Sequence, residues 1–341
     1  MSEAAGAGPV VCFGELLLRL SPQPGTQLSR ADDLALAVGG AEANVAVALA
    51  SLGVATRMLS VIPDNPLGLR ALAALGEAGV DRRHVKVGPG RMGMYFFEPS
   101  SGPISGRVTY DRAASAFVQA APEALDFAAA IEGASLLHLS GITPALGEAG
   151  VALAQAAIGA AREAGVPICF DGNYRTNLWD AWDGDPRSIL TELVEAASIL
   201  IGNHRDISLL LGKTFSGDGG DRRREAAEAA FTRFPNLQIV ASTARHVESA
   251  TVNGVAARVD LRESHWQTDE LRIAPIVDRI GTGDAFAAGV LLRWREGGSA
   301  QDMAKTGLAL AAMKHGIPGD SIAVTREDLD HFEPAGNDVR R

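Results

Sequence analysis

The chain has 341 residues, of which 47% are hydrophobic and 21% charged, and its formal net charge at pH 7 is −10. These values are typical of a globular protein with a core, and they argue against a nucleic-acid-binding surface, which needs clustered lysine and arginine. Cys12 and Cys169 lie in separate apolar runs, which disfavours a disulfide framework, and the first residues do not resemble a signal peptide. We therefore expect a soluble, cytoplasmic protein that binds neither nucleic acid nor membranes.

Short β-branched runs alternate with longer alanine- and leucine-rich segments along most of the chain. The predicted strands are 9–20, 54–62, 134–140, 166–171, 198–203 and 237–242. The predicted helices are 39–53, 64–79, 145–164, 186–196 and 284–296. This alternation predicts an α/β fold with a central, mostly parallel sheet flanked by helices.

Two segments depart from this alternation. Residues 91–112 contain two strand-like runs joined by a Ser/Gly/Pro turn, which predicts an antiparallel hairpin that acts as a small β lid or an interface element. Residues 250–260 predict a second hairpin, with its turn at Asn253-Gly254. The predicted organisation is a single α/β domain over 10–330, a lid at about 91–112 with part of 14–24, and a frayed tail over 331–341.

The segment DRIGTGDAFAAGVL, residues 278–291, places two glycines directly before an apolar helix. The first N–H groups of a helix have no intrahelical partners, so Gly281, Thr282 and Gly283 are candidates to hold a phosphoryl group. Asp284 would then stand beside this group and accept a proton from an attacking hydroxyl. The alternative is that Asp284 only caps the helix.

The segment VGGAEANVAVALASLG also places glycines before a helix. Gly40 would let a ligand approach the backbone, and the Asn44 amide would both donate and accept hydrogen bonds, as sugar hydroxyls require. The alternative is a tight helix entry with an exposed Asn44.

Cationic side chains follow two predicted strands. FDGNYRTNLW supplies Asp171, Asn173 and Arg175, and VTYDRAAS supplies Tyr110 and Arg112. Two arginines in one cleft suit a carboxylate or a phosphate, which arginine can bind bidentately. Taken separately, each arginine is more typical of a surface residue than of a binding site.

Several common motifs are absent. Lys213-Thr214 does not end a Walker A loop, because Ile207 stands where its first glycine belongs. No G-x-G-x-x-G follows the first strand, no G-x-S-x-G is present, and the histidines lack metal-ligand spacing with cysteine. A dinucleotide dehydrogenase, a serine hydrolase and a zinc site are therefore disfavoured.

Over about residues 10–330 the chain resembles the ribokinase-like (PfkB) carbohydrate kinases. VGGAEANVAVALASLG resembles the family's first signature, and DRIGTGDAFAAGVL resembles its second, D-T-x-G-A-G-D-x-F. Between them, IPDNPLGLRALAALGEAGVD resembles the family's V-G-x-D-x-x-G and leucine-rich helix. Within the family, the segments that handle an acid are similar to those of the 2-keto-3-deoxygluconate kinases.

This resemblance implies a role for each matching residue. Asp284 would be the base, and the backbone amides of Gly281, Thr282, Gly283 and Asp284 would form the anion hole. The family's G-x-Y-F, Y-x-R and D-x-N-x-R-x-x-L-W patterns match residues 93–96, 110–112 and 171–179. The substrate-binding residues so implied are Gly40, Asn44, Tyr95, Tyr110, Arg112, Arg175 and Asp320.

Cofactor residues match the family less closely. Asn173, Asn203 and Asp206 are expected to serve ATP and Mg²⁺, although Asp206 stands where the family has glutamate. Asp278 matches a position associated with a monovalent cation such as K⁺. The family's G-x-x-G nucleotide loop is replaced by STARHVESA, residues 242–250, which contains no glycine. Nucleotide preference is therefore open.

The expected activity is ATP-dependent phosphorylation of the terminal hydroxyl of a keto-deoxy sugar acid, from 2-keto-3-deoxygluconate to its 6-phosphate. The alternatives are a kinase of a neutral sugar such as fructose or ribose, and a sugar-binding regulator that has lost catalysis. The expected partners are the sugar acid, the nucleotide and further copies of the chain in a homo-oligomer.

Overall fold

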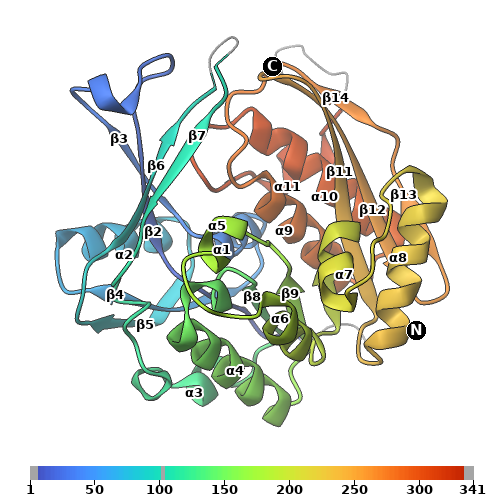
Figure 1. The fold of residues 1–341 in the computed structure, drawn as a ribbon, viewed down its shortest axis with the longest axis horizontal. Helices are drawn as coiled ribbons and strands as arrows, with labels where there is room; N and C mark the ends of the chain where they lie inside the picture. The colour runs from blue at the N-terminus through green and yellow to red at the C-terminus, as the bar shows by residue number, and fades with distance from the viewer. Residues whose placement is uncertain (1–6, 101–103, 334–341) are drawn as a thin grey trace.

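A computed structural model describes residues 7–100 and 104–333. Its large sheet has the strand order β13-β12-β11-β10-β9-β8-β1-β4-β5, with β14 also paired to β12 (Figure 1). The strands from β11 to β5 in this order are parallel, and β12, β13 and β14 are antiparallel additions. The strands are β1 (Val10–Phe13), β4 (Thr56–Pro63), β5 (Asp81–Gly88), β8 (Leu136–Ser140), β9 (Ile168–Asp171), β10 (Ile199–Ile201), β11 (Ile239–Ser249), β12 (Val252–Leu261), β13 (His265–Gln267) and β14 (Leu271–Ile273).

Helices cover both faces of this sheet, because successive side chains of a buried strand point to opposite sides. Val10 and Cys12 belong to one core cluster, whereas Val11 and Phe13 belong to the other. The first cluster is packed by α1 (Ala41–Ser51), α2 (Pro66–Glu77), α9 (Thr282–Arg295), α10 (Ala300–His315) and α11 (Arg326–Asp330). The second is packed by α3 (Phe127–Ile131), α4 (Glu148–Glu163), α5 (Thr176–Trp179), α6 (Pro186–Val194), α7 (His204–Leu211) and α8 (Gly219–Arg233). The predicted α/β fold is confirmed.

A second, smaller sheet, which we call the lid sheet, has the order β3-β2-β6-β7. Its strands are β2 (Leu17–Ser21), β3 (Ala35–Gly39), β6 (Gly93–Glu98) and β7 (Arg107–Asp111). β6 and β7 pair antiparallel, which confirms the predicted hairpin, although residues 101–103 lie outside the described residues. Figure 1 shows the lid sheet at one side of the molecule and the long β11–β12 hairpin at the other.

Two predictions about strands are wrong. The predicted strand 9–20 is two strands, because Gly14, Glu15 and Leu16 carry the chain from β1 in the large sheet to β2 in the lid sheet. The hairpin turn is not at Asn253-Gly254: both residues pair within β12, and the turn joins β11 to β12 after Ser249. Pairing with β11 and β14 overrides the local turn preference there.

The lid strand β3 and the edge strand β5 were not predicted, since β3 is half exposed and β5 is rich in charged residues. At the start of the predicted tail, Phe332 packs against the core, and residues 334–341 lie outside the described part. Cys12 and Cys169 are buried and free. Within the described residues, no helix is long and apolar enough to cross a membrane.

Candidate active site

A cavity of about 510 Å³, the first cavity, lies between the lid sheet and the carboxyl ends of the parallel strands. A second cavity of about 610 Å³ adjoins it and shares residues of β11 and of the start of α9 with it. Ligands bind at the carboxyl ends of the strands in open α/β sheets, so both cavities lie where a ligand is expected. The predicted site residues that line the first cavity are Gly40, Asn44, Tyr95, Tyr110, Arg112, Asn173, Arg175, Asn203, Asp206, Gly281, Thr282, Gly283, Asp284 and Asp320.

The start of α9 forms the wall between the two cavities. The first intrahelical hydrogen bond runs from the Ala285 N–H to the Gly281 carbonyl at 2.9 Å, so the amides before Ala285 have no intrahelical partner. Gly281 has φ 77°, and a Cβ there would lie 1.7 Å from the Asp320 carbonyl oxygen. A Cβ at Gly283 would meet no protein atom within 4 Å beyond its own turn of the helix. The first glycine is thus required by the fold, whereas the second leaves space open beside the amides.

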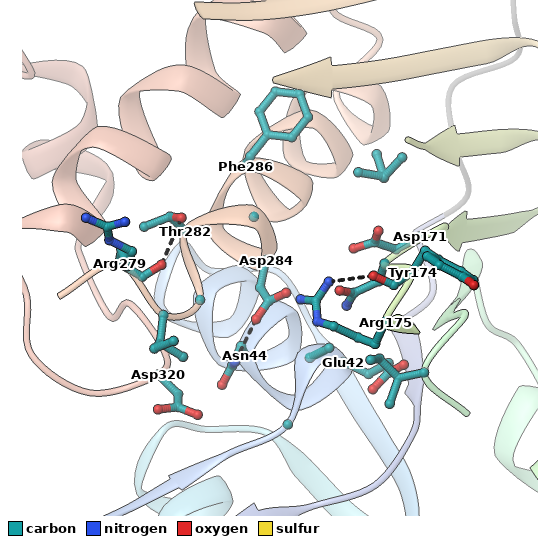
Figure 2. Close-up of a pocket in the computed structure, with 18 of the residues that line it drawn as sticks. Glu42, Asn44, Asp171, Tyr174, Arg175, Arg279, Thr282, Asp284, Phe286 and Asp320 are labelled. Carbon is teal, nitrogen blue, oxygen red and sulfur yellow. Dashed lines mark hydrogen bonds between the residues drawn. The ribbon is translucent and has the colours of Figure 1, made fainter. Parts of the chain in front are cut away.

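Asp284 faces this space from the first turn of α9. Its Oδ2 accepts a hydrogen bond of 2.7 Å from Asn44 Nδ2 on α1, as Figure 2 shows. Burial raises the pKa of Asp284 to about 7, and the Asn44 hydrogen bond partly opposes this rise in pKa. A half-buried carboxylate that lines a cavity and titrates near neutral pH is suited to accept a proton from a bound hydroxyl.

Two lid strands hold Asp320 at the opposite wall. The Tyr95 hydroxyl on β6 donates to Asp320 Oδ2 at 2.5 Å, and Arg19 Nη1 on β2 lies 3.1 Å from Asp320 Oδ1. Arg19 is buried and also stacks over the Phe97 ring. The lid sheet is therefore joined to the segments that precede α9 and follow α10 through ion pairs and hydrogen bonds at the cavity itself.

The two arginines that sequence reasoning selected differ in their surroundings. Arg112 is buried, and its guanidinium pairs with Glu15, with Nε 2.8 Å from Oε2; the Ser115 hydroxyl donates to the same carboxylate. Arg175 is exposed, donates only to the Tyr174 carbonyl at 3.1 Å, and has no carboxylate within ion-pair distance among the described residues. Figure 2 shows its guanidinium directed toward Asp284. Arg175 therefore has its guanidinium free of close ion pairs and available to a ligand, although its charge lowers the pKa of Asp284, Asp171 and Asp206 from a longer distance.

A profile of pfkB family carbohydrate kinases matches residues 8–325. The chain belongs to this family. It is 33% identical over 330 residues to 2-dehydro-3-deoxygalactonokinase of Haloferax volcanii, with 96% of this chain and 97% of that protein covered. The crystal structure of 2-dehydro-3-deoxygluconokinase from Thermotoga maritima matches with a TM-score of 0.90 and 34% identity, covering 96% of this chain and 98% of that one. The ribokinase-like fold is confirmed, and the protein is a carbohydrate kinase.

Further carboxylates surround the first cavity of the kinase, and sequence reasoning gave Glu42 no role. Glu42 is buried in the first turn of α1, and its Oε1 has no hydrogen-bond partner among the described residues. Burial raises the pKa of Glu42, Asp171 and Asp206. Several carboxylates in one partly desolvated place repel one another when ionised, so the binding of a positively charged group among them is favoured.

The donors present fit Mg²⁺. The described residues contain no ready group of three or more acidic, histidine or cysteine ligands, but Mg²⁺ binds through one or two carboxylates together with water and phosphate oxygens. Asp206 also has a structural task, because its Oδ2 accepts from the Asn203 N–H at 2.8 Å in a capping box at the start of α7. Asp206 and Asp171, which both line the first cavity, would be the carboxylates to hold such an ion.

Asp278 does not line either cavity. Arg19 Nη1 lies 2.7 Å from its Oδ2, Oδ1 accepts from the Ile280 N–H at 3.0 Å, and Oδ2 accepts from the Gly319 N–H at 3.1 Å. Because a guanidinium and two amides already occupy this carboxylate, it does not fit the expected role of ligand to a monovalent cation.

Sequence reasoning missed several residues at the site. Glu15 and Glu42 carry weak signals, since Glu15 follows an apolar strand and Glu42 opens a helix after two glycines. Arg245 and Arg279 line the first cavity without having been singled out. Arg19 carries no signal, because nothing local shows that a charged residue within a lid strand will reach Asp278 and Asp320.

Proposed function

We propose that this carbohydrate kinase transfers the γ-phosphoryl group of ATP to the terminal hydroxyl of a keto-deoxy sugar acid, converting 2-keto-3-deoxygluconate to its 6-phosphate. The observation that carries the proposal is the position of Asp284, beside the bare amides of α9 and in the same cavity as the unpaired Arg175. The names of the Haloferax and Thermotoga relatives support a substrate of this class.

In the proposed reaction the acceptor oxygen attacks the γ-phosphorus, its proton passes to Asp284, and ADP leaves with the electrons of the broken P–O bond. The Asn44 amide orients Asp284 through its 2.7 Å hydrogen bond. The amides of Gly281, Thr282 and Gly283 receive charge on the phosphoryl oxygens. Most of the acceleration comes from this positioning, with the base adding on the order of 10²–10⁴-fold.

Arg175 would bind the carboxylate of the sugar acid, because a guanidinium matches a carboxylate with two parallel hydrogen bonds. Gly40, Asn44, Tyr95, Tyr110, Arg112 and Asp320 would form the rest of the sugar site. Gly40 has φ 136°, and a Cβ there would lie 2.4 Å from the Glu15 carbonyl oxygen, so glycine also satisfies the backbone at this point. Arg112 would act on the sugar only together with its partner Glu15.

Asn173, Asn203 and Asp206 would serve the nucleotide side, and bound Mg²⁺ would neutralise the β- and γ-phosphate oxygens. Asn173 has φ 40°, a backbone conformation that asparagine tolerates better than most residues and that positions this side chain at the cavity. Closure of the lid over 91–112 would exclude water from the reaction. We further propose that the kinase associates into a homo-oligomer.

The test is a coupled ADP-release assay with Mg-ATP and a panel of acceptors. We expect turnover with 2-keto-3-deoxygluconate or its galactonate epimer, and kcat/KM at least about 100-fold lower with fructose and ribose. The neutral-sugar alternative is favoured by one observation, the neutralisation of Arg112 by Glu15. Preferential turnover of fructose or ribose would establish that alternative and refute ours. No turnover with any acceptor would favour a regulator without catalysis.

A further inference from the structure

The segment that replaces the glycine-containing nucleotide loop is part of β11. β11 pairs with β10 as far as Ala241, and Arg245 follows beyond that point, past the carboxyl end of the parallel strands. Arg245 pairs with Val255 on β12, so the antiparallel hairpin holds its backbone in a regular strand. An arginine thus stands on a regularly paired strand where the resemblance places a glycine-containing loop.

Arg245 is placed at the junction of the two cavities. The residues that line both cavities are Gly202, Asn203, Ser242, Thr243, Arg245, Thr282 and Gly283. Within this shared set, Arg245 is the charged member, and Thr282 and Gly283 supply the bare amides of α9. A phosphate chain that extends from the second cavity toward Asp284 must pass through this junction.

Among the described residues, none forms an ion pair or a hydrogen bond with the side chain of Arg245, which is exposed. Arg279, nearby in the first cavity, donates to the Ala250 carbonyl and likewise has no carboxylate partner within the described part of the chain. Besides burial, the charge of Arg245 lowers the pKa of Arg279, and it also contributes to the lowered pKa of His315. Arg245 and Arg279 therefore carry positive charges at the junction without close counter-charges, and a polyanion would supply them.

The surrounding residues show that this placement is specific to Arg245. Val247 lines only the second cavity, and the exposed neighbours His246 and Glu248 line neither cavity. His246 lies 3.9 Å from Glu270, and Glu248 pairs with Arg272 at 3.1 Å. The alternate charged side chains of the hairpin are thus engaged with one another, whereas Arg245 points to the junction.

We propose that Arg245 binds the β- and γ-phosphates of the nucleotide and supplies, through its guanidinium, the hydrogen bonds that a glycine loop would supply through backbone amides. The inference rests on the proposed kinase function and adds a catalytic residue to it, because a cation that contacts the γ-phosphoryl group also stabilises the charge that develops during transfer. Arginine suits this position since its fork donates two parallel hydrogen bonds to phosphate oxygens.

The experiment compares the full-length variants Arg245→Ala and Arg245→Lys with the control Arg272→Ala, which removes an exposed arginine of the same region that lines neither cavity. ADP affinity is measured by calorimetry with Mg²⁺ and without sugar. Since a hydrogen bond to a charged group is worth a factor of about 10 to 100, Arg245→Ala should weaken ADP binding about 10-fold or more. Arg245→Lys should lose less ADP affinity than Arg245→Ala, and the ADP affinity of the control should stay within about two-fold of wild type.

Three readouts decide the outcome. At saturating ATP, Arg245→Ala should lower kcat by about 10-fold or more, and added guanidinium ion should restore part of this loss. An ADP affinity for Arg245→Ala within about two-fold of wild type would overturn the inference. The thermal unfolding midpoint should not change, which separates the proposal from a folding defect. ADP binding is measured without an acceptor, so an acceptor panel that refuted the sugar acid would leave this result standing.

Discussion

The lid side of the first cavity and the junction of the two cavities differ in how their charges are balanced. At the lid side Arg112 is paired with Glu15, and Arg19 behind it with Asp278 and Asp320. At the junction Arg245, which lines both cavities, has no carboxylate within ion-pair distance among the described residues. The protein therefore assembles the lid side by itself, whereas the junction depends on an anionic ligand for its counter-charge. Substitutions of the paired arginines should cost stability as well as activity, and those of the unpaired arginines should cost activity alone.

Asp284→Asn should have the largest effect on activity. It removes the proton acceptor and keeps the shape, so kcat should fall on the order of 10²–10⁴-fold while KM for the sugar acid changes little. The measurement is steady-state kinetics with Mg-ATP. Turnover at the wild-type rate would show that Asp284 is not the base.

The same variant should be more stable than wild type at alkaline pH. Because the pKa of Asp284 is raised in the folded state to about 7, the folded protein binds a proton that the unfolded chain has released, and wild-type stability falls as pH rises from about 4 through 7. The thermal unfolding midpoint of Asp284→Asn should therefore be higher than that of wild type at about pH 8, and the two midpoints should lie closer together at about pH 5.

Arg19→Ala should have the largest effect on stability. It leaves the carboxylates of Asp278 and Asp320 buried without their cation, which costs about 3–5 kcal/mol. Urea unfolding checks this value. Arg175→Ala is the matched control, because Arg175 is exposed and makes no ion pair with a described residue, and its unfolding free energy should change by less than about 0.5 kcal/mol.

Arg175→Ala should instead act on the substrate. Loss of a charged hydrogen bond to the sugar carboxylate should raise KM for the sugar acid about 10- to 100-fold and leave any weak use of fructose unchanged. Arg175→Lys should keep part of the affinity. An equal loss of kcat/KM with the sugar acid and with the neutral sugar would contradict a contact between Arg175 and the substrate carboxylate.

The pH profile should reveal the link between Asn44 and the base. kcat should rise with pH through about 7 as Asp284 loses its proton. Asn44→Ala removes a hydrogen bond that lowers the pKa of Asp284, so the midpoint of this rise should move to higher pH. A profile of Asn44→Ala that coincides with the wild-type profile after scaling would refute this coupling.

Replacement of K⁺ by choline should have the smallest effect. Asp278 is occupied by Arg19 and two amides, so activity should change by less than about two-fold. A strong dependence on K⁺ would show that a cation binds through other groups near α9.

The fold and the centre of the site were predictable because their signals are local. Alternating strands and helices indicate a parallel sheet, and glycines before an apolar helix indicate bare amides with Asp284 beside them. The carboxyl ends of parallel strands meet at one edge, so segments far apart in the chain converge there without further information. The prediction of a turn at Asn253-Gly254 was wrong because strand pairing outweighed the strong local preference of these two residues for a turn.

The sequence by itself determined the sheet, the lid hairpin and the placement of Asp284, since each depends on periodicity and backbone preferences over a few residues. Only the tertiary structure decided which charges are free. Arg112 and Arg175 belong to equally suggestive motifs, yet Glu15 pairs with the first and no carboxylate of the described chain lies within ion-pair distance of the second. Ion pairing depends on distances between residues remote in the chain, and neither composition nor spacing contains those distances.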